Sequence, residues 1–286
     1  MPAKECSIDS LGDKLSARLF LPDHILSPVP CILLVHGAID KKEHFFELAN
    51  YFCKMGFAAL ALDMHGHGGS EGERFHVRMD QWVPDLEAAI AYLESVEEVD
   101  ANRVGIFGFS SGGTAALELA AKTHRVKALV TLDATVCTIV NRFEELCFLF
   151  LSQIGRIKRR WTGRDLHLPL YRVAIQSRVA CCPEVNQAFL TNEYLKAGYT
   201  RYPLPGALES IVTSTLSRVH RIACPVCVMH GAEDNVDSPD SARKLYSALT
   251  SVKELHILPN SGHVGHLDYA KDTVMAISTK WFDQHL

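Results

Sequence analysis

The chain contains 286 residues, 48% of them hydrophobic and 22% charged, which is the composition of an ordinary soluble globular protein. A formal net charge of −4 gives no reason to expect a nucleic-acid partner. The N-terminal residues lack the apolar segment of a signal peptide, and no apolar run reaches the roughly 18 residues that a membrane-spanning helix needs.

The nine cysteines are odd in number and scattered along the chain. Cys31 and Cys227 lie inside apolar, strand-like runs, where a free cysteine acts as a small hydrophobic residue. This distribution favours a reduced, cytoplasmic protein over a disulfide-linked one, and neither a zinc site nor a cofactor is expected.

Apolar runs typical of strands alternate with amphipathic segments along most of the chain. Residues 4–8 and 14–21 are expected to form an antiparallel hairpin. Further strands, buried on both faces, are predicted at residues 31–35, 57–62, 104–109, 126–132, 225–229 and 254–258. Helical spacing is present at residues 44–55, 81–96, 241–249 and 269–282, and directly after Ser110. This order predicts an α/β fold with a mostly parallel central sheet flanked by helices.

The alternation stops between residues 135 and 217, which are expected to be helical or irregular, with no clear strand. An insertion of this length is too long for a simple loop and predicts a small helical cap or lid. The sheet domain is then expected to consist of residues 1–134 and 218–286.

The segment from Arg103 to His124 has the sequence RVGIFGFSSGGTAALELAAKTH. It combines an apolar strand, a glycine-rich turn and a helix, with Ser110 at the centre of G-x-S-x-G. In this context the turn presents a serine hydroxyl as a nucleophile. The alternative is a glycine-rich turn that binds an anion at the helix N-terminus.

A serine hydroxyl needs a base, and that base needs an orienting carboxylate. Candidates for both follow predicted strands, whose carboxyl ends meet at one edge of the sheet. For the acid these are Asp234, Asp237 and Asp133, and for the base His263 and His266. The order serine, aspartate, histidine is the one found in hydrolases with a nucleophile elbow.

Three stretches of the N-terminal half carry a family resemblance: His36-Gly37-Ala38, HFFELA at residues 44–49 and GHGGSEGER at residues 66–74. With the elbow, they make the chain similar to the α/β-hydrolase fold serine hydrolases outside the cap, and more narrowly to monoacylglycerol lipase-like esterases. The elbow here is Gly-Phe-Ser-Ser-Gly, where Gly-His-Ser-Met-Gly is usual in that group. This difference keeps the nucleophile and leaves the substrate open.

The resemblance implies roles for individual residues. It assigns the acid to Asp234 and the base to His263, with His266 then an exposed loop side chain. It also implies that the backbone N–H groups of Ala38 and Ser111 bind the oxyanion of acyl transfer, while His36 braces its loop.

Asp63, His65 and His67 are residue types that can bind a metal ion. The resemblance assigns this run to a structural turn, and no further ligand set with zinc spacing follows. No metal is therefore expected.

The segment Leu146–Ile154, LCFLFLSQI, is strongly apolar and precedes a basic segment that ends at Trp161. It predicts either a lid that touches a membrane surface or receives an acyl chain, or a helix packed on the core with a solvated basic edge. In both cases the cap is expected to form a wall of the substrate pocket.

The main hypothesis is a serine hydrolase that cleaves a carboxylic ester with an acyl or otherwise hydrophobic part. A rival is hydrolysis or transfer of an acyl thioester, since the basic residues from Arg156 to Arg164 are suited to attract a carrier's phosphates. Another is a binding module without catalysis, which would be marked by loss of the serine, histidine or aspartate. Nothing in the sequence indicates the oligomeric state or the physiological substrate.

Overall fold

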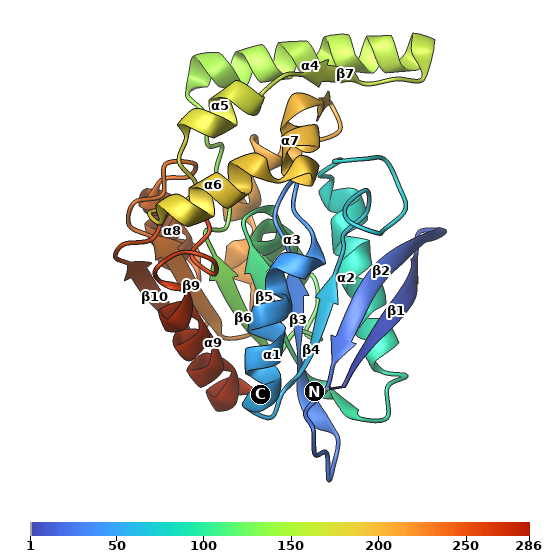
Figure 1. Ribbon diagram of the computed structural model, residues 1–286, viewed down its shortest axis with the longest axis vertical. Coiled ribbons are helices and arrows are strands. Elements are labelled where there is room, and N and C mark those ends of the chain that lie inside the picture. Colours follow the sequence, from blue (N-terminus) through green and yellow to red (C-terminus); the bar gives the residue numbers. More distant parts are fainter. Residues whose placement is uncertain (1) are drawn as a thin grey trace.

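The computed structural model describes residues 2–286, apart from the side chain of Ile175, and within them an eight-stranded sheet runs through the middle of the protein (Figure 1). Its strand order is β1-β2-β4-β3-β5-β6-β9-β10. β1 and β2 form an antiparallel hairpin, β2 is antiparallel to β4, and all other neighbours are parallel. The strands are β1 (Ala3–Ser10), β2 (Asp13–Phe20), β3 (Val29–Val35), β4 (Ala58–Leu62), β5 (Val99–Phe109), β6 (Ala128–Leu132), β9 (Val226–Gly231) and β10 (Lys253–Leu258).

Helices cover both faces of this sheet, which explains why its central strands are continuous apolar runs. In β3, Cys31, Leu33 and Val35 pack into the core on one face. Ile32 and Leu34 alternate with them and pack on the other. The first face is covered by α2 (Met79–Leu93), α3 (Ser111–Ala120) and α8 (Pro239–Ala248), the second by α1 (Phe46–Lys54) and α9 (Lys271–His285).

The segment between β6 and β9 contains the helices α4 to α7, which lie together at the top of the molecule in Figure 1, opposite the two chain termini. We call residues 135–217 the cap. Its helices are α4 (Arg142–Thr162), α5 (Tyr171–Gln176), α6 (Pro183–Thr191) and α7 (Glu193–Thr200). The expectation of no strand here is wrong, because β7 (Leu166–Leu168) pairs with β8 (Tyr202–Leu204) in an antiparallel ribbon.

The long helix α4 packs on the rest of the cap through a small residue, since a Cβ on Gly155 would collide with the carbonyl oxygen of Leu204. Phe148 and Leu151 pack inward on the core. Apolar side chains on the opposite side are exposed at spacings of three or four residues, from Phe143 to Trp161. Despite this apolar stripe, no helix within residues 2–286 is long and apolar enough to cross a membrane.

Candidate active site

Ser110 lies at the sharp turn between β5 and α3. Its φ of 49° and ψ of −122° are uncommon for a residue with a side chain, and such strain is concentrated at functional positions. Glycines make the turn possible, because a Cβ on Gly108 would lie 2.7 Å from the Cα of Gly113, and one on Gly112 would collide with the carbonyl oxygen of His36. The sequence GFSSGG therefore encodes this close packing of strand, serine and helix.

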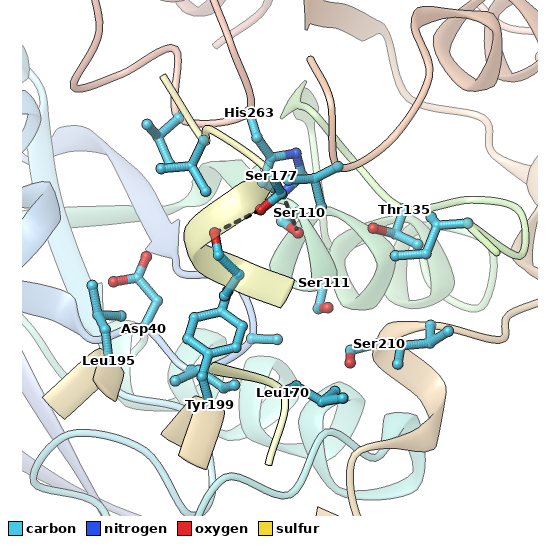
Figure 2. Close-up of a pocket in the computed structure, with 18 of the residues that line it drawn as sticks. Asp40, Ser110, Ser111, Thr135, Leu170, Ser177, Leu195, Tyr199, Ser210 and His263 are labelled. Atoms are coloured by element: carbon cyan, nitrogen blue, oxygen red, sulfur yellow. Dashed lines mark hydrogen bonds between the residues drawn. The ribbon is translucent and has the colours of Figure 1, made fainter. Parts of the chain in front are cut away.

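His263, in the loop after β10, lies between Ser110 and Asp234. Its Nε2 is 3.0 Å from Ser110 Oγ, and its Nδ1 is 2.7 Å from Asp234 Oδ2. Figure 2 shows the first of these contacts, with the imidazole of His263 directed at the Ser110 hydroxyl. If Nδ1 donates to the carboxylate, Nε2 is free to accept the serine proton, which is the tautomer a general base requires.

Asp234 follows β9 and is held by its own loop, since its Oδ1 accepts hydrogen bonds from the backbone N–H groups of Val236 (2.7 Å) and Asp237 (3.0 Å). Burial opposes ionisation of Asp234. The charge of His263 and the hydrogen bonds that Asp234 accepts from His230 and His263 nevertheless keep the pKa of Asp234 well below its usual range. Burial alone would lower the pKa of His263, yet the adjacent Asp234 carboxylate raises it. The pair therefore combines a permanent carboxylate with a basic imidazole.

The two other candidate acids have different partners. The Asp237 carboxylate accepts a hydrogen bond from Ser241 Oγ at 2.6 Å. Asp133, at the end of β6, accepts one from the backbone N–H of Gly231 at 2.8 Å. Neither hydrogen-bonds His263, so Asp234 is the candidate acid that the structure brings together with the histidine and the serine.

The expectation that His266 is an exposed loop side chain is wrong. His266 is only 4% exposed and stacks on Phe45 with ring centroids 4.6 Å apart. It also packs against Phe109, and neither ring nitrogen has a hydrogen-bond partner within residues 2–286. Burial lowers the pKa of His266 to about 3, so this imidazole is neutral near neutral pH.

The loop after β3 lies directly against the serine turn. A Cβ on Gly37 would be 3.0 Å from Ser110 Cβ, and Ala38 and Ser111 line the same cavity as Ser110. His36 holds this loop: its Nε2 accepts from the backbone N–H of Met64 at 3.0 Å, and its Nδ1 is 2.7 Å from the Gly37 carbonyl oxygen. The bracing role expected for His36 agrees with these contacts.

The cavity has a volume of about 400 Å³ and opens above Ser110, between the cap and the loops that follow β3, β5, β6, β9 and β10 (Figure 2). Its walls are mostly apolar. The cap contributes Phe148, Leu170, Val173, Phe189, Leu195 and Tyr199. A cavity of this size and character accommodates a hydrophobic group beside the serine hydroxyl.

One wall of the cavity carries a charged pair that sequence analysis missed. Asp40, two residues after Ala38, accepts a hydrogen bond at Oδ1 from Nδ1 of His44. Burial opposes both charges, but each partner favours the charge of the other, so the pKa of Asp40 is lowered and that of His44 is raised. The four-residue spacing of Asp40 and His44 is the sequence pattern from which this pair could have been predicted.

Asp63, His65 and His67, which are residue types that can bind a metal ion, have partners within the protein. Asp63 Oδ2 is 2.7 Å from Lys42 Nζ, and His65 Nδ1 is 2.5 Å from Asp85 Oδ1. His67 Nδ1 is 2.9 Å from the carbonyl oxygen of His65. These contacts agree with the expected structural turn.

Within residues 2–286, another group has candidate ligand atoms within 4.8 Å of one another: Asp133, His230 and Asp234. Asp234 Oδ1 accepts a hydrogen bond from the backbone N–H of Val236, and Asp234 Oδ2 lies 2.7 Å from His263 Nδ1. Within the buried group, Asp234 is thus already engaged in contacts with Val236 and His263. Sequence analysis also missed a C-x-x-C pair, Cys224 and Cys227. Cys227 is buried inside β9, and both thiols are free.

The sheet order, the serine turn after β5 and the loops that carry Asp234 and His263 define this protein as an α/β-hydrolase. It belongs to the family described as serine aminopeptidase, S33 (Hydrolase_4), whose model matches residues 27–269. This result confirms the fold and the family resemblance expected from the sequence.

Relatives and solved structures cover most of the chain. A thermostable monoacylglycerol lipase of Bacillus sp. (strain H-257) is 25% identical over 257 residues, which cover 89% of this chain and 90% of the lipase. The polyketide transferase ATR5 of Stachybotrys chlorohalonatus is 24% identical over 251 residues, 82% of each chain. The structure of the α/β hydrolase GrgF from Penicillium sp. sh18 superposes with a TM-score of 0.85 at 19% identity, covering 100% of this chain and 99% of that one.

Proposed function

We propose that this hydrolase cleaves carboxylic esters through an acyl-enzyme, with Ser110 as nucleophile, His263 as base and Asp234 as the orienting acid. One observation carries the proposal: the hydrogen-bonded chain from Asp234 through His263 to Ser110 ends at an apolar cavity of about 400 Å³. A nucleophile with its base and acid in hydrogen-bond range is the arrangement that acyl transfer requires.

In the first step Ser110 Oγ attacks the ester carbonyl carbon while its proton passes to His263 Nε2. The carbonyl oxygen becomes an oxyanion, and we propose that the backbone N–H groups of Ala38 and Ser111 bind it. His263 then gives the proton to the departing alcohol, which leaves an acyl group on Ser110. Water repeats the sequence, with His263 again accepting a proton, and releases the carboxylic acid.

The substrate class follows from the cavity walls. Apolar side chains of the cap favour a hydrophobic acyl or alcohol group, and the relation to a protein named monoacylglycerol lipase supports a lipid-like ester. In this proposal residues 135–217 act as a cap that shapes the substrate pocket over a hydrolase core of residues 1–134 and 218–286.

Labelling with a fluorophosphonate probe tests the mechanism, because such probes react with an activated serine. We expect labelling of the wild-type chain and none of Ser110→Ala, while Ser247→Ala, an exposed serine of α8, serves as the matched control. p-Nitrophenyl esters of graded acyl length then rank substrates. Wild-type hydrolysis by Ser110→Ala would overturn the proposal.

A second candidate is hydrolysis or transfer of an acyl thioester by the same residues. The similarity to a protein named polyketide transferase favours it, as do the exposed Arg156, Lys158, Arg160 and Arg164 at one end of the cap. Comparing the turnover of an acyl-CoA with that of the ester of the same acyl group separates the two functions. An amide of that acyl group is measured as a third substrate.

We also propose that the exposed apolar stripe of α4 contacts a membrane surface, since arginines and a lysine lie beside its last residues, near the C-terminal end of the helix. Finally, we propose a cytoplasmic location, because all nine cysteines are free, as a reducing compartment keeps them.

A further inference from the structure

A second histidine lies behind the carboxylate of Asp234. His230 is the penultimate residue of β9 and is buried, with its Nε2 3.1 Å from Asp234 Oδ2. The same nitrogen is 3.1 Å from the carbonyl oxygen of Asp237, in hydrogen-bond range. Because His263 contacts Asp234 Oδ2 at 2.7 Å, one carboxylate oxygen lies between two imidazoles.

A second aspartate lies behind His230. Asp133 has a φ of 51° at the end of β6, which is strained for a residue with a side chain, and is fully buried. Its Oδ1 accepts from the backbone N–H of Gly231, next to His230, and lies 3.9 Å from His230 Nδ1. Within residues 2–286, neither His230 Nδ1 nor Asp133 Oδ2 has a hydrogen-bond partner. Most buried polar atoms in proteins have a hydrogen-bond partner, so these two call for an explanation.

The four groups therefore form a buried row from three neighbouring strand ends: Asp133, His230, Asp234 and His263. Burial opposes a charge on His230, but contact with Asp234 and the field of Asp133 raise its pKa to about 9. Burial raises the pKa of Asp133 to about 7, although His230 acts in the opposite direction. Near neutral pH His230 is thus a cation on the side of Asp234 that faces away from His263.

Two further titratable groups face the row. The Asp237 carboxyl, bonded to Ser241, acts on both histidines from the loop after β9, and burial raises its pKa. His266, in the same loop as His263, stays neutral because burial lowers its pKa to about 3. Asp133 and His230 are therefore the groups behind Asp234 whose charges act on His263 with opposite signs.

We propose that His230 and Asp133 are positioning residues that set, through Asp234, how readily His263 accepts the serine proton: His230 weakens the attraction of the carboxylate for that proton and Asp133 strengthens it. This inference rests on the proposed role of His263 as the base. A positive charge beside Asp234 competes with the imidazolium of His263 for the same carboxylate oxygen. A negative charge behind it favours that imidazolium.

Two nearly isosteric variants separate these effects. His230→Gln keeps an N–H donor but removes the charge, and should move the acidic limb of kcat/KM upward by roughly half a pH unit to one unit. Asp133→Asn keeps an acceptor for Gly231, and should move the limb downward, while Asp234 still holds His230 protonated. The shift should be smaller than in His230→Gln, because Asp133, with a pKa of about 7, is only partly ionised in the pH range of the limb. His256→Gln, at a half-buried histidine of β10 paired with Glu254, is the control and should leave the limb in place.

NMR titration of the His263 imidazole, identified by the signal lost in His263→Gln, reports the same shifts without any substrate. If the wild-type chain neither reacts with a fluorophosphonate nor hydrolyses esters, the proposed function fails while this titration still tests the row. Shifts in the same direction, or an unmoved His263 in folded His230→Gln, would overturn the inference even in an active enzyme. If Asp133→Asn does not fold, the direction of the His263 pKa shift in His230→Gln alone tests the inference.

Discussion

The carboxylate of Asp268 accepts a hydrogen bond from the backbone N–H of Gly262, the residue immediately before His263, at 2.8 Å. It also accepts from the N–H groups of Cys181 (2.6 Å) and Cys182 (2.8 Å), which connect two helices of the cap. One buried side chain thus joins the cap to the loop of the proposed base. On the other side of His263, the N–H of Val264 donates to the carbonyl oxygen of Val179, also in the cap, at 3.2 Å.

Asp268→Ala should therefore impair catalysis without removing any group that touches the substrate. The variant leaves several buried N–H groups without an acceptor, at a cost of about 1–3 kcal/mol for each one that water does not reach. The His263 loop then shifts, and a displacement of about 1 Å lowers rates about 100-fold. Fluorophosphonate labelling rates and thermal melting measure the two effects.

The isosteric Asp268→Asn keeps one acceptor oxygen, so we expect a smaller loss than in Asp268→Ala. Asp272→Asn changes an exposed acid at the start of α9 and is the matched control. A stable Asp268→Ala protein with wild-type labelling would show that the cap contact does not position His263.

The choice between neighbouring acids gives a sharper test of the proposed triad. Asp234→Asn should lower kcat by about 10³–10⁴-fold, because the amide no longer fixes the His263 tautomer or stabilises its imidazolium. Asp237→Asn should lower kcat far less, since the Asp237 carboxylate accepts a hydrogen bond from Ser241 and has none to His263. Comparable losses in the two variants would contradict the assignment of Asp234.

The choice was difficult from sequence because Asp234, Asp237 and Asp133 all follow predicted strands of one sheet. Strand order and the elbow motif were readable, since parallel strands leave apolar runs and the turn after β5 requires its glycines. Which carboxylate faces His263 depends on a contact between residues 29 positions apart in the chain. No local pattern encodes that distance.

His266 shows a second limit of local patterns. Its loop forms a turn in which the N–H of Leu267 donates a hydrogen bond to the carbonyl oxygen of Val264. This turn places His266 against Phe45, the residue immediately before α1. The sequence GHVGH around His266 does not reveal that His266 stacks on Phe45, which is far away in the chain. The β7–β8 ribbon escaped prediction for the same reason, because two three-residue strands far apart in sequence have no detectable period.

The pH dependence of hydrolysis follows from the state of His263, which must be neutral to accept the serine proton. Burial lowers its pKa, but Asp234 outweighs burial and raises it above the usual value of about 6.5. The rate should therefore be lost as the pH falls through this raised pKa, and should be constant above it. Measuring kcat/KM against pH checks the sign, and an acidic limb below pH ~6 would contradict the proposed Asp234 contact.

The apolar stripe of α4 predicts reversible binding to lipid. Phe143 is 75% exposed, Phe150 66% and Trp161 83%, on the side of the helix away from the cavity-lining Phe148. Burying such side chains in a bilayer surface contributes about 1.5–3 kcal/mol each, and the nearby basic residues favour anionic lipid. Co-sedimentation with phosphatidylserine-containing vesicles measures the effect.

Phe150→Ser combined with Trp161→Ser should weaken vesicle binding at least 10-fold, since two buried side chains are lost and each ~1.4 kcal/mol is a factor of ten. Val252→Ser is the control, because Val252 is also an exposed hydrophobic side chain, at 62%, but lies before β10, outside the cap. The double variant should retain hydrolysis of water-soluble short-chain esters, because neither side chain lines the cavity. Equal vesicle binding by wild type and double variant would contradict lipid binding by the stripe, and loss of short-chain activity would instead indicate a damaged cap.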